Sequence, residues 1–257
     1  MIAPGEGHPT DLATPATPVA HVAEDVQRLA SEAGTLEDLD ACSSVCRACP
    51  RLVAWREEVA QVKRAAFRDQ TYWGRPITGW GCAEPAIVVM GLAPAAHGGN
   101  RTGRIFTGDR SGDWLFAALH RAGLARQPES VSADDGQELI DTRITLPVRC
   151  APPANKPTEQ ERATCAPWLE RELQWLLPSA RVIVTLGAFG WTSTLRMLQA
   201  PRRPFAHGAE LSHDGRTVLA CFHVSQQNTF TGRLTEDMLD TVFVRARELA
   251  GLGPVVT

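Results

Sequence analysis

The sequence lacks any apolar run that reaches the roughly 18 residues needed to cross a membrane. Its first 20 residues lack the basic start and apolar core of a signal peptide, and they hold four prolines. We therefore expect a disordered or weakly ordered N-terminal tail over residues 1–35 and a cytoplasmic protein, where disulfides are rare. The net charge of −3 and the pI of about 6.2 exclude a strongly basic chain but not local basic segments.

Short apolar runs alternate with amphipathic segments along the sequence. With 44% hydrophobic residues, the 257-residue chain has enough apolar side chains for a substantial core. Strands are predicted at residues 86–90, 143–149, 181–186 and 217–222, and helices at residues 22–33, 52–67, 111–123, 157–177, 187–198 and 235–250. This order predicts an α/β protein, a three-layer α/β/α fold around a four-stranded parallel sheet, in one domain over residues 36–252.

Four of the seven cysteines are candidate metal ligands. Cys46 and Cys49 form a compact chelating pair in a polar setting, whereas Cys150 and Cys165 flank a proline-rich loop and the start of a helix. Four thiolates from two segments can hold a zinc ion or an iron–sulfur cluster, and their spacing leaves both open. Cys42 is an alternative ligand.

Two long loops follow predicted strands, GLAPAAHGGNRTGRIFTGD at residues 91–109 and HVSQQNTFTGRLT at residues 223–235. Together with RCAPPANKPT at residues 149–158, they resemble the motifs of the family 5, or type B, uracil-DNA glycosylases, in the same order. The resemblance extends from about residue 46 to the last helix. It implies a monofunctional glycosylase that flips uracil and other deaminated or damaged bases out of double-stranded DNA and excises them by hydrolysis, which starts base excision repair.

The resemblance also implies a cofactor and three catalytic residues. A structural [4Fe–4S] cluster would be bound by the four cysteines Cys46, Cys49, Cys150 and Cys165. Of the catalytic residues, His223 would hydrogen-bond the base carbonyl, and Asp109 would orient water or stabilise the sugar cation. The third, Asn155, would contact the base or the water. A structural histidine, a helix N-cap and a turn asparagine are the alternatives.

The resemblance places the flipped base in an apolar pocket. Phe106 would stack on the base, with simple core packing as the alternative, and the loop at Gly91, Ala93 and Ala95 would line the pocket. This first motif lacks the acidic or amide residue that other uracil-DNA glycosylases use there. Fewer specific hydrogen bonds discriminate less, so we expect hypoxanthine, ethenocytosine and 5-hydroxymethyluracil as substrates beside uracil.

The expected partner is double-stranded DNA, bound by a monomer. Arg101 and Arg104 belong to a basic segment that could follow the phosphate backbone, although a solvated charged face is the alternative. In the last motif, Arg233 would contact a phosphate, and either Phe230 or Leu234 would wedge into the minor groove.

Three other functions compete with this one. A non-catalytic DNA-binding protein whose iron–sulfur cluster senses redox state would keep the cysteines without needing His223 or Asp109. A zinc-binding structural module would need the thiols alone, and a strictly uracil-specific enzyme conflicts with the apolar first motif. No lysine motif argues for a Schiff base, which favours a hydrolytic, monofunctional glycosylase.

Overall fold

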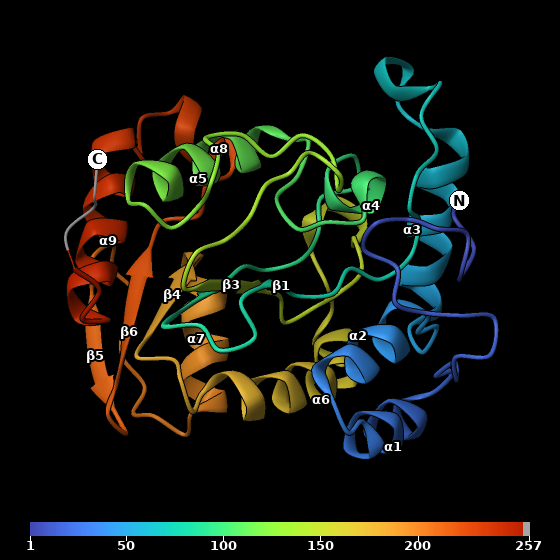
Figure 1. Ribbon diagram of the computed structural model, residues 1–257, viewed down its shortest axis with the longest axis horizontal. Coiled ribbons are helices and arrows are strands. Elements are labelled where there is room, and N and C mark those ends of the chain that lie inside the picture. Colours follow the sequence, from blue (N-terminus) through green and yellow to red (C-terminus); the bar gives the residue numbers. More distant parts are fainter. Residues whose placement is uncertain (254–257) are drawn as a thin grey trace.

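A sheet of six strands forms the middle layer of the protein, whose computed structural model describes residues 1–253 (Figure 1). In spatial order the strands are β1 (Trp80–Gly81), β3 (Thr142–Thr145), β2 (Ile87–Met90), β4 (Val182–Leu186), β6 (Arg216–Cys221) and β5 (Glu210–His213). The four inner strands run parallel, as predicted, and the two edge strands pair antiparallel. The sequence missed the edges because β1 has two residues and β5 has no buried side chain.

Helices surround this sheet within the described residues. They are α1 (Ala23–Glu32), α2 (Leu36–Ser44), α3 (Pro50–Val62), α4 (Gly99–Thr102), α5 (Arg110–Arg121), α6 (Glu159–Leu176), α7 (Gly187–Met197), α8 (Gln226–Phe230) and α9 (Glu236–Leu249), with 3-10 turns η1 (Ala65–Phe67) and η2 (Pro153–Asn155). Local sequence sets the helix starts: Thr158 and Glu161 form a capping box at α6, and each side chain accepts a hydrogen bond from the backbone N–H of the other. Nowhere in residues 1–253 does a helix combine the length and the apolarity needed to span a membrane.

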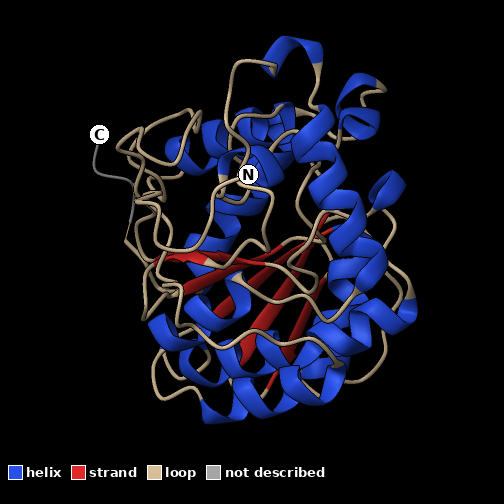
Figure 2. Ribbon diagram, turned by 90° about the vertical axis from the view of Figure 1, so that its right-hand side faces the viewer, coloured by secondary structure: helices blue, strands red, loops and turns tan. Residues whose placement is uncertain are grey.

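The two faces of the sheet bury different side chains because successive strand residues point to opposite sides. In β2, Ile87 and Val89 pack in the core that includes residues of α5 and α9, whereas Val88 and Met90 pack against residues of α6. Residues of α7 cover the second face over β6. The strands therefore lie between helical layers, as Figure 2 shows, and the predicted three-layer α/β/α architecture is confirmed.

The N-terminal residues lie against the rest of the protein, which corrects the expected disordered tail over residues 1–35. The carboxylate of Asp11 accepts hydrogen bonds of 2.8 and 2.7 Å from the guanidinium of Arg75, and both side chains are almost fully buried. The ring of His8 lies 4.7 Å from that of Trp73, between centroids. Helix α1 shares a core cluster with Trp168 of α6. The proline-rich composition suggested disorder, and composition alone does not reveal these partners that lie far away in the sequence.

Candidate active site

A cleft of ≈ 630 Å³ opens beside the loop that follows β2. The loop contributes Ala95, and the start of α5 and the turn η2 contribute Asp109 and Asn155. Other lining residues are Arg64, Phe67, Ala96, His97, Gly98, Arg101, Gly108, Arg110, Asp113, Val131 and Gln226. The structure therefore brings two of the three predicted catalytic side chains, from segments far apart in sequence, to one cavity.

Asp109 serves as the N-cap of α5 and also lines the cleft. Its Oδ1 accepts a 2.9 Å hydrogen bond from the backbone N–H of Gly112. A Cβ atom added at Gly98 would overlap Oδ2, so the glycine lets the cleft loop approach this second oxygen. Burial raises the pKa of the Asp109 carboxyl, and the hydrogen bond from Gly112 opposes that shift. The capping role and the predicted catalytic role are thus compatible, because they use different oxygens.

Phe106 occupies a strained position against the loop after β2. Its φ of 51° lies in the left-handed region, which a phenylalanine rarely adopts, and such strain is concentrated at functional sites. A Cβ at Gly91 would lie 3.3 Å from the Phe106 ring, so this glycine sets the close approach. The ring centroids of Phe106 and His223 lie 6.3 Å apart at 46°. The predicted base-stacking ring and the predicted base-binding histidine are therefore neighbours.

His223 follows strand β6 and is held through its backbone. Asn228 Nδ2 donates a 2.8 Å hydrogen bond to the carbonyl oxygen of His223, and Gly187 packs against its Cβ. Burial lowers the pKa of His223 to about 4, so its imidazole is neutral at physiological pH. A neutral imidazole carries one N–H donor without a net charge. The sequence pointed to His223, but not to the support that Asn228 gives it.

Asn155 and Ala95 line the cleft, whereas Ala93 lies elsewhere. Ala154 and Asn155 both have positive φ, at 53° and 55°, which turns the exposed Asn155 side chain into the lining of the cleft. Ala95 lines the same cleft. Ala93, which we expected beside the base, packs instead with the cluster of Leu52, Val148 and Cys150. It links the catalytic loop to the cysteines.

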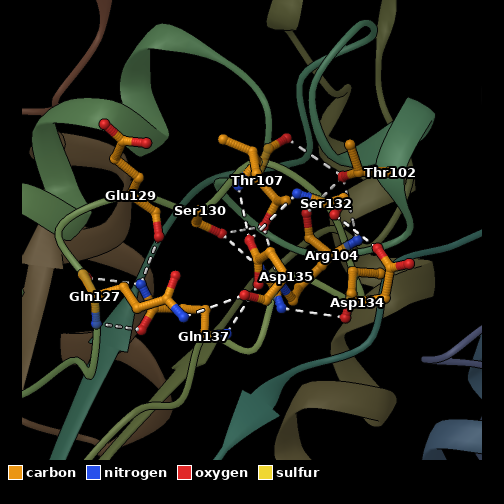
Figure 3. Close-up of polar contacts among 12 residues, drawn as sticks. Thr102, Arg104, Thr107, Gln127, Glu129, Ser130, Ser132, Asp134, Asp135 and Gln137 are labelled. Carbon is orange, nitrogen blue, oxygen red and sulfur yellow. Dashed lines mark hydrogen bonds and ion pairs between the residues drawn. The ribbon is translucent and has the colours of Figure 1, made fainter.

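Arg104 does not reach the DNA-binding surface, which corrects its predicted role. Its side chain is 4% exposed and pairs with Asp135 at 2.6 Å. It also donates to Thr107 Oγ1 at 3.0 Å and to Ser130 Oγ at 2.8 Å (Figure 3). We call these residues, with Gln137, the Arg104 network. The network fastens residues 127–137 to the loop that ends at Asp109, so Arg104 acts within the fold.

Arg101 has a mixed setting. The side chain is largely buried and donates hydrogen bonds to the carbonyl oxygens of His97 and Gly108, at 2.8 and 2.6 Å. Its guanidinium lies 4.0 Å from the centre of the Phe67 ring. Because Arg101 still lines the cleft, a contact with DNA stays a prediction. Arg64 and Arg110 line the same cleft and are exposed, and the basic composition around them was the signal for both.

The last motif presents Phe230 and Arg233 to solvent and buries Leu234. The Phe230 side chain is 67% exposed, whereas Leu234 is fully buried and belongs to the main core. This burial excludes Leu234 as the wedge that the sequence left open. The guanidinium of Arg110 lies 5.1 Å from the centre of the Phe230 ring, and exposed Arg233 lies over Phe222 at 4.7 Å. The exposed Phe230 ring therefore has one neighbouring cation, Arg110, which also lines the cleft.

The four predicted ligand cysteines line one cavity at the N-terminal end of α3. Cys46, Cys49, Cys150 and Cys165 all contribute to its wall, and the alternative ligand Cys42 does not. Over residues 1–253, no three or more His, Cys, Asp or Glu side chains gather closely enough to hold a single metal ion.

The chemistry of the cavity wall fits an anionic, multi-atom group such as an iron–sulfur cluster. Three lining residues carry buried N–H groups without a hydrogen-bond partner in the described structure: Arg56 Nε, Arg149 Nε and Trp168 Nε1. Such donors are costly unless something accepts from them. Burial raises the pKa of the Cys49 thiol to about 12, with Cys150 and Cys46 adding to the shift, so this thiol stays protonated unless a metal replaces the proton.

The sequence was compared with known proteins. Residues 78–246 match the profile of the uracil DNA glycosylase superfamily. The chain is 57% identical to a type-5 uracil-DNA glycosylase of Mycobacterium tuberculosis, over 98% of this chain and 95% of that protein. It is 52% identical to a type-5 uracil-DNA glycosylase of Thermus thermophilus, over 81% of this chain and 95% of that protein. The chain therefore belongs to the uracil-DNA glycosylase superfamily, with the type-5 enzymes as its relatives.

Proposed function

We propose that the protein is a monofunctional DNA glycosylase that hydrolyses the glycosidic bond of uracil and other deaminated or damaged bases in double-stranded DNA and so begins base excision repair. The observation that carries the proposal is the meeting of complementary groups at one edge of the sheet. Asp109 and Asn155 line one cleft, and neutral His223 lies beside Phe106. The type-5 uracil-DNA glycosylases named among the relatives support this function.

Base extrusion comes first, because the glycosidic bond is out of reach inside the duplex. Phe230 has the exposed apolar ring that a minor-groove wedge needs, Arg110 lies beside it, and the exposed Arg233 lies over Phe222; both cations would meet phosphates. The flipped base would stack on Phe106, whose ring lies against Gly91. Stacking compensates part of the cost of leaving the duplex.

Cleavage of the glycosidic bond separates charge, and His223 would stabilise the negative charge on the departing base. As the glycosidic bond breaks, its electron pair goes to the base and leaves an oxocarbenium ion on the sugar. The neutral imidazole of His223 donates a hydrogen bond to the base carbonyl oxygen where negative charge accumulates. Because its pKa is about 4, His223 stabilises the departing base without transferring its proton.

Asp109 suits the positive end of the reaction. Its Oδ1 is occupied by the helix cap, whereas Oδ2 borders the cleft loop at Gly98. The carboxylate would stabilise the cationic sugar and orient water, whose oxygen bonds to the anomeric carbon while its proton passes to Asp109 and then to solvent. The side-chain amide of Asn155, in the same cleft, would hold this water or the base. The products are the free base and an abasic site.

A [4Fe–4S] cluster would be held by Cys46, Cys49, Cys150 and Cys165, which line one cavity. When bound, the group would supply a rigid cross-link between α3, α6 and the loop after β3, and no reaction chemistry. Ala93 packs beside Cys150 and belongs to the loop after β2, so a fixed cavity would hold the catalytic loop in position.

Substrate range follows from the apolar wall of the first motif. Ala95 and Ala96 line the cleft without a side-chain donor or acceptor, so few contacts distinguish uracil from other bases. We therefore include hypoxanthine, ethenocytosine and 5-hydroxymethyluracil among the substrates. The protein would act as a monomer in the cytoplasm, a state that size-exclusion chromatography with light scattering tests directly.

Base release from duplex oligonucleotides with one modified base tests the proposal. Strand breaks after alkali should appear with uracil and with hypoxanthine, and borohydride should trap no covalent adduct. The His223→Ala variant should bind the same duplex but release no base, whereas a binding or redox-sensing protein would release no base even as the wild type. Release of uracil alone would contradict the broad pocket and leave the glycosylase in place.

A further inference from the structure

Arg56 is a buried arginine in the wall of the cysteine cavity. It lies in α3, and its side chain is among the largest fully buried ones in the protein, at 1% exposure. Nη1 donates a 2.9 Å hydrogen bond to Cys150 Sγ, and Nη2 donates a 3.0 Å hydrogen bond to the carbonyl oxygen of Cys46. Nε has no partner in the described structure. The guanidinium therefore contacts two of the four predicted ligand residues directly.

The charge of Arg56 has no partner of opposite sign among residues 1–253. Its neighbours in the cavity wall differ: Arg149 pairs with Asp40 at 3.1 Å and with Glu172 at 2.8 Å. An arginine keeps its charge under all ordinary conditions, and a buried charge without a counter-charge is strongly destabilising. Arg56 is thus a buried cation that no carboxylate of residues 1–253 neutralises, next to thiols that become anionic when they bind metal.

Helix α3 aligns this cation with a ligand. Cys49 is the N-cap, and Leu52, Val53 and Arg56 follow at the spacing of one helical face; all four line the cavity. The ligand therefore lies at the start of the helix, and the cation follows two turns later. Because Arg56 is braced inside a helix, its donors have a fixed position relative to Cys150.

We propose that Arg56 is the counter-charge and positioning residue of the metal group on the four cysteines. It neutralises the thiolates, which outweigh the positive charge of an iron–sulfur core, and it holds Cys150 by an N–H···S hydrogen bond. This inference rests on the proposed cluster. Hydrogen bonds to ligand sulfurs and nearby charge stabilise an iron–sulfur group and set its reduction potential.

The test compares Arg56→Met, Arg56→Lys and Arg47→Met in the full chain. Arg47 lies between two ligand cysteines, but its side chain is exposed and pairs with Glu57, so its variant controls for the loss of a nearby charge. Iron content, the rate of iron loss to a chelator and the midpoint potential are measured on purified protein. Unfolding by urea is then measured with and without the metal.

Arg56→Met should lose iron roughly 10-fold faster than the wild type, and its midpoint potential should shift to more negative values. Without metal, the same variant should be at least as stable as the wild type, because the uncompensated charge is gone. Arg56→Lys should restore part of the iron retention and of the potential. Arg47→Met should behave as the wild type.

Unchanged iron retention and potential in Arg56→Met would overturn the inference while leaving the cluster in place. So would a metal-free Arg56→Met protein that is less stable than the metal-free wild type, since that result marks a purely structural arginine. If Arg56→Met fails to fold, Arg56→Gln decides, because it keeps a hydrogen-bond donor without the charge, and wild-type potential and iron loss in that variant would also overturn the inference. A wild type without iron would overturn both the cluster and the inference.

Discussion

The Arg104 network and the candidate cleft both include residues of the segment from Arg104 to Asp109. They differ in whether their polar side chains have hydrogen-bond partners within the protein. In the network, Arg104 finds acceptors for Nε, Nη1 and Nη2, and Asp135 accepts from Arg104 and from three backbone N–H groups (Figure 3). In the cleft, the Asn155 amide has no hydrogen bond within the described residues, and Asp109 uses one oxygen. The ring of His223, which lies beside Phe106, has no hydrogen bond within the described residues either.

This difference separates stability from chemistry. A polar group whose partners lie within the protein contributes to stability, and a polar group left open keeps its hydrogen-bonding capacity for a substrate. Substitutions in the Arg104 network should therefore weaken folding, and those in the cleft should weaken excision. The four predictions below test that separation, from the largest expected effect to the smallest.

Asp109→Asn should lower the rate of uracil excision about 1,000-fold, or ~4 kcal/mol, because an amide cannot take a proton from water. Its free energy of unfolding should not fall, since asparagine caps helices as well as aspartate and burial disfavours the charge. Single-turnover kinetics and urea unfolding measure the two effects. A stable variant with wild-type kinetics would remove Asp109 from the chemistry.

Arg104→Met should lower the free energy of unfolding by about 3 kcal/mol, because Asp135 would stay buried without its cation. Adding Asp135→Asn should restore part of this loss. Urea unfolding measures both, and the excision rate per folded molecule should change far less than in Asp109→Asn. Loss of DNA affinity without loss of stability would instead return Arg104 to the DNA-binding surface.

His223 should make stability depend on pH. Its pKa falls from about 6.5 to about 4 on folding, so its contribution is complete above pH 6.5 and is lost as the pH falls toward 4. Between pH 7 and pH 5 this loss amounts to about 2 kcal/mol. In His223→Gln, the free energy of unfolding should change by about 2 kcal/mol less between pH 7 and pH 5 than in the wild type. In His21→Gln, at an exposed site, it should change as in the wild type. Equal slopes would show that His223 is solvated.

Phe230→Ala should slow excision from duplex DNA by about 10-fold and leave excision from single strands almost unchanged, because the wedge acts on stacked bases. Val244→Ala, which truncates another exposed apolar side chain, serves as the matched control. Both rates come from the same alkali assay. Equal slowing on single and double strands would assign Phe230 to the cleft instead.

Much of the fold was readable from local pattern. The four parallel strands were predicted within a few residues, because buried runs such as Ile87–Met90 are short, apolar and followed by glycine or polar loops. The edge strands β1 and β5 were missed because they carry no such run. For the candidate site, Asp109 and Asn155 line one cleft and His223 lies beside Phe106, and the assignment of these two pairs to one site stays a prediction.

Burial of individual side chains was not readable. Arg104 and Arg110 lie in one basic segment, yet the Arg104 side chain is buried, at 4% exposure, whereas Arg110 is exposed to solvent. Phe230 and Leu234 lie four residues apart in one motif, yet the Phe230 side chain is exposed and the Leu234 side chain is buried. Composition does not distinguish the members of either pair, because it reports the chemistry of a side chain and not its neighbours.

The sequence by itself determined the order of strands and helices and the chemical groups in the loops that follow the strands, since both depend on residues close together along the chain. The tertiary structure alone decided which charges are paired, which ring is exposed and which thiols share a cavity. Asp135 lies 31 residues from Arg104, and Cys150 lies 94 residues from Arg56. Partners so far apart meet because the core packs, and local periodicity holds no record of that packing.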